Sequence, residues 1–280
     1  MPKITHNRAF PYEDRESDIL VGTLGGDGGD EDDATYGFDD KQDGSDVLSV
    51  HFDGSDGNGQ VFGGPNDDTI KGGKGLDALY GEGGDDWIYG GADRDWLFGG
   101  DGQDHLFGED GCDDLYGDAG QDVLYGGELS DLLDGGAGSD ILVGGEGADW
   151  LTGGSGYDSF QINWENLFKH DSPAFQPDVI MDFSSFDDVI ELIGTGPFLS
   201  PAEYVEATID YGAGYEKARE QALSLLESDD KQYAFVTDGV DGYLFVEVYP
   251  NDALEDVEIG VILKGLTALS DFDATDLFCV

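Results

Sequence analysis

Large apolar residues recur at every ninth position between residues 63 and 161, beginning with Ile70 and ending with Phe160. Each stands alone between two neighbours of more mixed character, which is the alternation of a very short strand with one inward side chain. Glycines stand before and after each such segment, where they allow positive φ angles and tight turns. The pattern predicts a series of three-residue strands separated by turns.

The same segment divides without a gap into eleven nonapeptides, from GGPNDDTIK to GGSGYDSFQ. Every unit has glycine at position one, aspartate at position six and a large apolar residue at position eight. No single unit can bury its apolar residue alone, so two units form one coil and the coils stack. The predicted fold class is all-β, a parallel β-roll or two-sheet β-solenoid. The position-six residues are Asp68, Asp77, Asp86, Asp95, Asp104, Asp113, Asp122, Asp131, Asp140, Asp149 and Asp158.

Stacking places aspartates eighteen residues apart on the same flank, because neighbouring strands lie about 4.8 Å apart. Two bare carboxylates at about 5 Å repel by roughly 0.8 kcal/mol in bulk water and by more at a protein surface. A hard divalent cation would turn this repulsion into a bridge. Calcium suits the site because it accepts six to eight oxygens, including the carbonyls that glycine turns expose. Magnesium demands stricter geometry, and the absence of regular His or Cys ligands disfavours zinc and copper.

The units GGAGSDILV and GGEGADWLT resemble the GGxGxDxUx nonapeptide of RTX proteins, where U is a large apolar residue. This resemblance implies a β-roll in which the position-six aspartates bind Ca²⁺ between successive turns on each flank. Asp140 would then share ions with Asp122 and Asp158, and not with Asp149. If every neighbouring pair were filled, the roll would hold about nine ions.

The repeats depart from the consensus at position four, where Asn66, Asp93 and Leu129 replace glycine. Asn and Asp tolerate the left-handed conformation, whereas Leu does not, so the turn around Leu129 is predicted to be the weakest site. One unit upstream, Gly59 stands where aspartate belongs while Val61 keeps the apolar position. This unit is predicted to be a capping coil.

Three regions are expected. Residues 1–53 carry degenerate repeats such as SDILVG (17–22) and GSDVLS (44–49), which suggest an ordered N-terminal cap with irregular coils and a loop near 27–40; the alternative is a solvated acidic tail. Residues 54–161 form the roll. Residues 162–280 are predicted to form a C-terminal capping and secretion-signal domain with two short β segments in 177–194, a helix over 214–228 and a hairpin in 232–249. Residues 54–280 resemble the C-terminal RTX domain of serralysin-type secreted proteases, without any protease domain.

The totals agree with a cation-binding protein. Sixty-three acidic residues against twelve Lys and Arg give a formal charge of −51, which argues against nucleic acid and anionic membranes as partners. No run of eighteen apolar residues and no conventional signal peptide occur, so no membrane span is expected. Cys112 and Cys279 form no metal-binding or disulfide pattern and are interpreted as lone thiols.

The chain ends in Asp276, Leu277, Phe278, Cys279 and Val280. An acidic residue followed by a few apolar ones resembles the uncleaved C-terminal signal of proteins exported by type I ABC transporters; the alternative is an ordinary last strand. Together with the repeats, this ending favours a secreted, extracellular protein whose partner during export is a type I secretion ABC transporter.

No catalytic motif was found: the four histidines form no HExxH, and neither a GxSxG elbow nor a P-loop is present. We therefore predict a non-enzymatic calcium-binding protein that folds on calcium binding after secretion. The alternatives are an enzyme of unseen class and a carbohydrate- or surface-binding module that would hold an extracellular polysaccharide or a cell surface. The binding module would use outward aromatic rings, which could instead only stabilise the stack; they stand at position nine of six successive units, Tyr80, Tyr89, Phe98, Phe107, Tyr116 and Tyr125.

Overall fold

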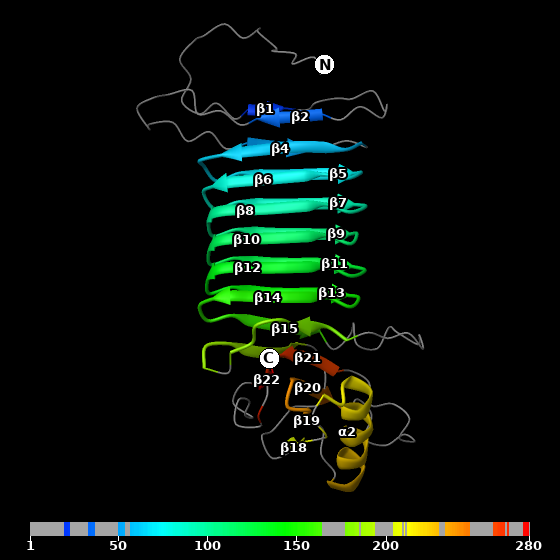
Figure 1. Ribbon diagram of the computed structural model, residues 1–280. Helices are drawn as coiled ribbons and strands as arrows, with labels where there is room; N and C mark the ends of the chain where they lie inside the picture. The colour runs from blue at the N-terminus through cyan, green and yellow to red at the C-terminus, as the bar shows by residue number, and fades with distance from the viewer. Residues whose placement is uncertain are drawn as a thin grey trace, which may run out of the picture.

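The protein is described by a computed structural model covering residues 20–22, 33–36, 50–53, 57–163, 177–184, 186–193, 204–208, 210, 212–229, 233–246, 260–266, 268 and 277–279. These residues form a tall parallel β-roll of two sheets, one of which continues into a C-terminal cap that also contains a helix (Figure 1). The all-β, two-sheet solenoid predicted from the nine-residue period is confirmed. In the described residues, no helix is long and apolar enough to span a membrane.

One face of the roll is a ten-stranded sheet. Its neighbouring strands are all parallel. In spatial order it contains β1 (Leu20–Gly22), β3 (Val50–Asp53), β5 (Thr69–Lys74), β7 (Trp87–Ala92), β9 (His105–Asp110), β11 (Val123–Glu128), β13 (Ile141–Glu146), β15 (Ser159–Asn163), β17 (Val189–Ile193) and β22 (Leu277–Cys279).

The other face belongs to a twelve-stranded sheet that continues from the roll into the C-terminal cap. In spatial order it contains β2 (Asp33–Tyr36), β4 (Gly59–Gly64), β6 (Ala78–Gly83), β8 (Trp96–Gly102), β10 (Asp114–Gly120), β12 (Leu132–Gly138), β14 (Trp150–Ser155), β16 (Val179–Ile180), β21 (Gly260–Lys264), β20 (Asp241–Val246), β19 (Tyr233–Thr237) and β18 (Tyr204–Thr208).

The stacking register is eighteen residues, as the two-unit coil requires. Leu97, for example, pairs with Leu79 above it and Leu115 below it. Position-eight side chains from both sheets meet in one core, and each is fully buried. A single apolar residue per unit therefore supplies the whole interior of the roll.

The strands are longer than predicted. The repeats form strands of six or seven residues, such as Trp87–Ala92 and Trp96–Gly102, and not of three. They continue past position nine through the glycine pair, because the glycine backbone of one coil pairs with that of the next, as Gly127 does with Gly145. The turn is correspondingly short.

Three N-terminal strands extend the roll, as expected for irregular coils. β3 pairs with β5, β1 pairs with β3, and β2 pairs with β4. The loop expected over residues 27–40 is wrong in part, because β2 lies inside it at Asp33–Tyr36, where its backbone adds a parallel strand to β4. The GSDVLS segment lies outside the described residues.

The C-terminal cap contains the elements predicted for it. The two β segments are β16 and β17, the helix is α2 (Tyr215–Asp229), and β19 and β20 form the antiparallel hairpin. Phe235 and Leu244 on one face of the hairpin join the core of the roll, whereas α2 packs on the other face through Ala218 and Ala222. The alternating faces of the hairpin thus connect the roll to the helix. β18, β21 and the parallel pairing of β18 with β19 were not predicted.

Candidate metal centre

The eleven position-six aspartates line the two flanks of the roll, where the chain turns from one sheet to the other. Flank I holds the turns from the ten-stranded to the twelve-stranded sheet, and flank II holds the return turns. All eleven side chains are buried, with at most 3% of their surface exposed. Flank I contains Asp77, Asp95, Asp113, Asp131 and Asp149; flank II contains Asp68, Asp86, Asp104, Asp122, Asp140 and Asp158.

From Asp77 onward, each carboxylate accepts a hydrogen bond from the coil before it. The Oδ1 atom of Asp122, for example, accepts a hydrogen bond of 2.9 Å from the backbone N–H of Asp104, eighteen residues earlier. The same bond joins Asp113 to the N–H of Asp95 at 2.8 Å on flank I. These bonds form an aspartate ladder along each flank. The predicted neighbours, Asp140 with Asp122 and Asp158, are indeed successive members of one ladder.

The second carboxylate oxygen has no such partner. In nine of these aspartates, Oδ2 is buried from solvent and receives no hydrogen bond. A buried ionised oxygen without a donor or a counter-charge is strongly unfavourable. Each flank therefore carries a column of negative atoms that the described protein groups leave unsatisfied. These nine are Asp77, Asp86, Asp95, Asp104, Asp113, Asp122, Asp131, Asp140 and Asp149.

For eight of these nine oxygens, all except that of Asp149, a backbone carbonyl oxygen approaches the same space. A Cβ atom placed on Gly117 would lie 2.7 Å from Asp122 Oδ2 and 2.6 Å from the carbonyl oxygen of Gly135. On flank I, a Cβ on Gly90 would lie 2.6 Å from Asp95 Oδ2 and 2.9 Å from the Gly108 carbonyl. Position one is glycine because two oxygens converge on the space that a side chain would need. This space is a cradle of oxygen atoms.

Burial also disturbs the ionisation of these groups. Desolvation raises the pKa of Asp86 and of Asp95 to about 8, although a backbone N–H bond partly opposes the shift. Desolvation likewise raises the pKa of Asp122 to about 7, again against an opposing backbone hydrogen bond. Neighbouring aspartates on the same ladder add repulsion. At neutral pH the protein alone therefore favours the protonated form of Asp86 and Asp95, and a bound cation would favour their ionised form.

The donor set fits calcium. Among the described residues, no three His, Cys, Asp or Glu side chains come together as a ready metal site. The converging atoms are instead one carboxylate oxygen and one carbonyl oxygen per turn, the hard oxygen donors that Ca²⁺ accepts. Of the thiolate and imidazole ligands that zinc prefers, these described turns contain one exposed thiol, that of Cys112, which is too few for a zinc site.

Two flank I turns are strained at position four. Asp93 and Leu129 adopt left-handed φ angles of 80° and 77°, the conformation expected there. Asp tolerates this region, but Leu pays about 1–2 kcal/mol because its Cβ crowds the following carbonyl. Three position-two residues are also left-handed, namely Glu82, Glu109 and Asp118. The turn around Leu129, which was predicted to be the weakest, thus adopts the same left-handed conformation at position four as the Asp93 turn, and this conformation costs free energy for leucine.

Sequence reasoning missed two members of the ladders. Asp178 Oδ1 accepts the N–H of Asp149, and Asp188 Oδ1 accepts the N–H of Asp158, both at 3.1 Å. They follow their partners by 29 and 30 residues, so the period of nine does not reveal them. A usable signal existed, because each begins an Asp-Val-Ile segment that matches positions six to eight of a repeat.

Comparison with known families agrees with this geometry. The model for the RTX calcium-binding nonapeptide repeat matches four times, over residues 53–88, 62–97, 89–124 and 125–160. No curated protein matches the chain. The matched residues include all eleven position-six aspartates of the repeats, but not Asp178 and Asp188. Residues 53–160 belong to the RTX family of calcium-binding nonapeptide repeats.

Proposed function

We propose that this protein is a non-enzymatic, secreted RTX protein whose roll folds when the position-six aspartates bind Ca²⁺ between successive coils. The observation that carries the proposal is the column of buried Oδ2 atoms without hydrogen-bond partners on each flank. A calcium ion supplies positive charge at this place, and these oxygens together with the glycine carbonyls can coordinate it. The repeat roll itself is a structural calcium-binding unit and not a catalytic one.

The same atoms make folding conditional. Without a cation, closing the roll buries carboxylates whose desolvation the remaining hydrogen bonds do not offset. The charge of −51 adds repulsion to the compact state. A chain of this kind remains unfolded where calcium is scarce and folds where it is abundant, because binding free energy becomes folding free energy. This coupling suits export of an unfolded chain by a type I ABC transporter.

The C-terminal tail is compatible with that route. Leu277–Cys279 forms β22, which pairs with β17 at the end of the ten-stranded sheet. In the folded chain these three residues thus form a strand, which leaves a signal role before folding open. A transporter would read the tail before the roll closes, and the strand would form afterwards.

Circular dichroism of the full chain with calcium and with EGTA tests the proposal. We expect a β-sheet spectrum with calcium and its loss in EGTA, while magnesium restores little of it. A variant with Asp122→Asn should need more calcium, whereas Asp101→Asn, on an exposed residue at position three, should not. An unchanged spectrum in EGTA would contradict calcium-coupled folding.

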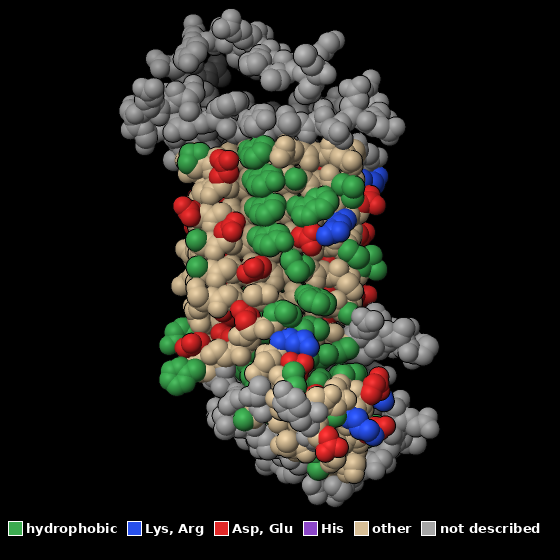
Figure 2. All heavy atoms as spheres, in the orientation of Figure 1, with side chains coloured by type: hydrophobic (Ala, Val, Ile, Leu, Met, Phe, Trp, Pro, Cys, Tyr) green, Lys and Arg blue, Asp and Glu red, His purple; other side chains and the backbone are tan. Residues whose placement is uncertain are grey.

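The polysaccharide-binding alternative depends on exposed ring faces. The aromatic column on the twelve-stranded face consists of Phe62, Tyr80, Phe98 and Tyr116, whose centroids lie 4.8–5.0 Å apart with nearly parallel planes (Figure 2). Rings stacked in this way cover one another and present edges, whereas sugars pack on faces. Stacking between rings of successive coils is therefore sufficient to account for the aromatic residues of this column.

The second column follows the same rule. Tyr89, Phe107 and Tyr125 stack on the ten-stranded face at 4.9 and 5.2 Å, and the Lys71 ammonium lies 5.3 Å from the ring of Tyr89. Trp87, 43% exposed, and Trp150, 53% exposed, retain open surface, but they lie on different sheets. A sugar-binding function stays a prediction that rests on these two side chains.

A further inference from the structure

The flank I ladder continues past the last repeat. Val179 and Ile180 of β16 pair with Trp150 and Leu151, as these residues pair with Leu132 and Leu133 one coil earlier. The N–H of Val179 donates to the Asp149 carbonyl at 2.8 Å, and the N–H of Trp150 donates to the Asp131 carbonyl at 2.9 Å. Asp178 therefore occupies position six of an additional coil.

The Asp178 side chain makes the contact that defines this position. Its Oδ1 accepts the Asp149 N–H at 3.1 Å, as Asp149 Oδ1 accepts the Asp131 N–H at 2.9 Å. Asp149 is fully buried and its Oδ2 has no hydrogen-bond partner. Within the described residues, the second oxygen of Asp178 likewise receives no hydrogen bond. At this end of flank I, Asp149 and Asp178 thus each have one oxygen without a hydrogen-bond donor among the described residues; Asp149 is fully buried, and Asp178 is partly buried.

Flank II ends differently. Asp188 takes the corresponding place below Asp158, but both of its oxygens accept backbone bonds, from the N–H of Asp158 at 3.1 Å and from Ser184 at 2.8 Å. Asp182 accepts from the N–H groups of Gly153 and Gly154 at 2.9 and 2.8 Å. The carboxylates that finish flank II are therefore satisfied by the backbone.

We propose that Asp178 is a further calcium ligand, which together with Asp149 forms one more site on flank I beyond the nonapeptide repeats, whereas Asp188 ends flank II without an ion. This inference rests on the proposed role of the position-six aspartates. With Asp178 added, six aspartates take part in the ion row of each flank.

Asp178 is the last member of its row. The N–H of Ile262 donates to the Asp178 carbonyl at 2.9 Å, so β21 follows in the same register. The residue of β21 that corresponds to Asp178 is Val261, a buried apolar residue. With no carboxylate there, Asp178 can take part in only one interval between coils, whereas an inner residue such as Asp131 takes part in two.

The test counts calcium ions bound per folded chain by equilibrium dialysis at saturating calcium. Asp178→Asn keeps an acceptor for the Asp149 N–H but loses the charge. This variant should bind one ion fewer than the wild-type protein. Asp188→Asn, the matched control on flank II, should bind the same number. Asp131→Asn, the control for an inner ligand, should bind at least one ion fewer.

The outcomes separate the two proposals. An unchanged count for Asp178→Asn beside a reduced count for Asp131→Asn would overturn the additional site and leave the proposed function intact. An unchanged count for Asp131→Asn would count against both. A reduced count for Asp188→Asn would overturn the difference between the flanks. If Asp178→Asn does not fold, a crystal structure of the calcium-loaded chain decides: an ion in contact with both Asp149 and Asp178 supports the site, and its absence rejects it.

Discussion

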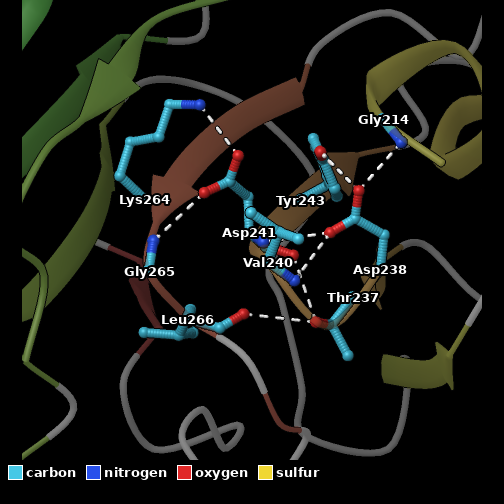
Figure 3. Close-up of polar contacts among 9 residues, drawn as sticks. All are labelled: Gly214, Thr237, Asp238, Val240, Asp241, Tyr243, Lys264, Gly265 and Leu266. Carbon is cyan, nitrogen blue, oxygen red and sulfur yellow. Dashed lines mark hydrogen bonds and ion pairs between the residues drawn. The ribbon is translucent and has the colours of Figure 1, made fainter. Parts of the chain in front are cut away.

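The roll and the C-terminal cap both bury aspartates, but they satisfy them in opposite ways. In the roll, Asp113 accepts one backbone bond and leaves Oδ2 without a donor. In the cap, Asp238 is 2% exposed and accepts four hydrogen bonds, from the N–H groups of Gly214, Val240 and Asp241 and from the Tyr243 hydroxyl (Figure 3). The cap therefore neutralises its buried charge with its own donors, whereas the roll depends on a cation.

The hydrophobic cores of the roll and of the cap also differ, and the core of the cap is the denser one. The roll buries one apolar side chain per nine residues, while the hairpin packs Phe235 and Leu244 on one side and Ala234, Val236 and Phe245 on the other. Burial of apolar surface is the main favourable term in folding. The cap thus has a denser core in addition to satisfied charges, and it should depend less on calcium.

Calcium removal should have the largest effect and separate the two regions. In EGTA, the backbone amides of residues 78–155 should lose protection from hydrogen exchange, whereas those of 233–246 should keep part of theirs. Hydrogen exchange with mass spectrometry measures both in one sample. Equal loss of protection in the two segments would show that the cap also requires the ion.

Core truncation should be the next largest effect. Leu115→Ala in the roll should cost about 2–5 kcal/mol of unfolding free energy, and Phe245→Ala in the cap about 3–5 kcal/mol. Only Leu115→Ala should also weaken apparent calcium affinity, since only the roll couples its folding to the ion. Urea denaturation at several calcium concentrations measures both quantities; a calcium-dependent cost for Phe245→Ala would refute the distinction.

Neutralising one buried aspartate in each region tests the charge argument directly. Asp238→Asn should destabilise the cap by about 1.5–3 kcal/mol, because charged hydrogen bonds are lost, without changing the number of bound ions. Asp113→Asn should reduce the number of bound ions. Thermal melting and calcium counting on the same samples distinguish the results, and a lower ion count for Asp238→Asn would contradict the comparison.

The two regions should respond to pH with opposite signs. The folded pKa of Asp86 and Asp95 is raised by burial to about 8, so the folded, calcium-free roll binds more protons than the unfolded chain between pH 4 and 8. Its stability is then greatest in acid and falls as the pH rises through 8. Calcium must displace these protons, so its affinity should fall in acid.

In the cap, burial opposes ionisation of Asp238, but the hydrogen bonds from Asp241, Gly214, Val240 and Tyr243 together outweigh burial, and the pKa of this carboxyl is lowered. Its contribution is present above the unfolded pKa and is lost as the pH falls through the folded one. Circular dichroism of the chain, depleted of calcium by EGTA at neutral pH and then dialysed into calcium-free buffer at pH 5 or pH 8, measures the roll. More β structure at pH 8 than at pH 5 would contradict the predicted pH dependence of the roll.

The smallest effect should come from relief of strain at Leu129. Leu129→Gly should stabilise the calcium-loaded roll by about 1 kcal/mol, since glycine adopts left-handed φ without cost. Leu76→Gly is the control, because Leu76 is also exposed but has ordinary φ, and it should be neutral or slightly destabilising. Melting temperatures in calcium compare them; equal shifts would mean that the strain at Leu129 is already relaxed.

The repeat pattern predicted most of the roll because one rule fixes it. A glycine, an aspartate and an apolar residue at constant spacing determine turn, flank and core, and the eighteen-residue register follows from closing two units into one coil. The period could not show that Oδ1 is used by a backbone N–H, which leaves Oδ2 alone for a metal. That division depends on how close successive coils lie.

Where the spacing changes, prediction from the period stops. Asp178 and Asp188 keep their places in the ladders although longer segments precede them, since register is set by strand pairing and not by chain length. β18 and β21 were missed for a related reason: they pair with strands distant in sequence and have no repeat to mark them. The hairpin and helix were found because their signals are local.

The antiparallel pairing of β20 with β21 also bears on how separate molecules meet. A parallel solenoid with a bare end presents unpaired N–H and C=O groups that another roll could extend. Here β21 continues the parallel register of β16, β20 runs the other way, and β19 and β18 run again in the direction of β21. The twelve-stranded sheet thus continues three strands beyond β21, whereas the ten-stranded sheet ends at β22. A second roll could not pair with both sheet edges at once, so the cap opposes end-to-end growth into filaments.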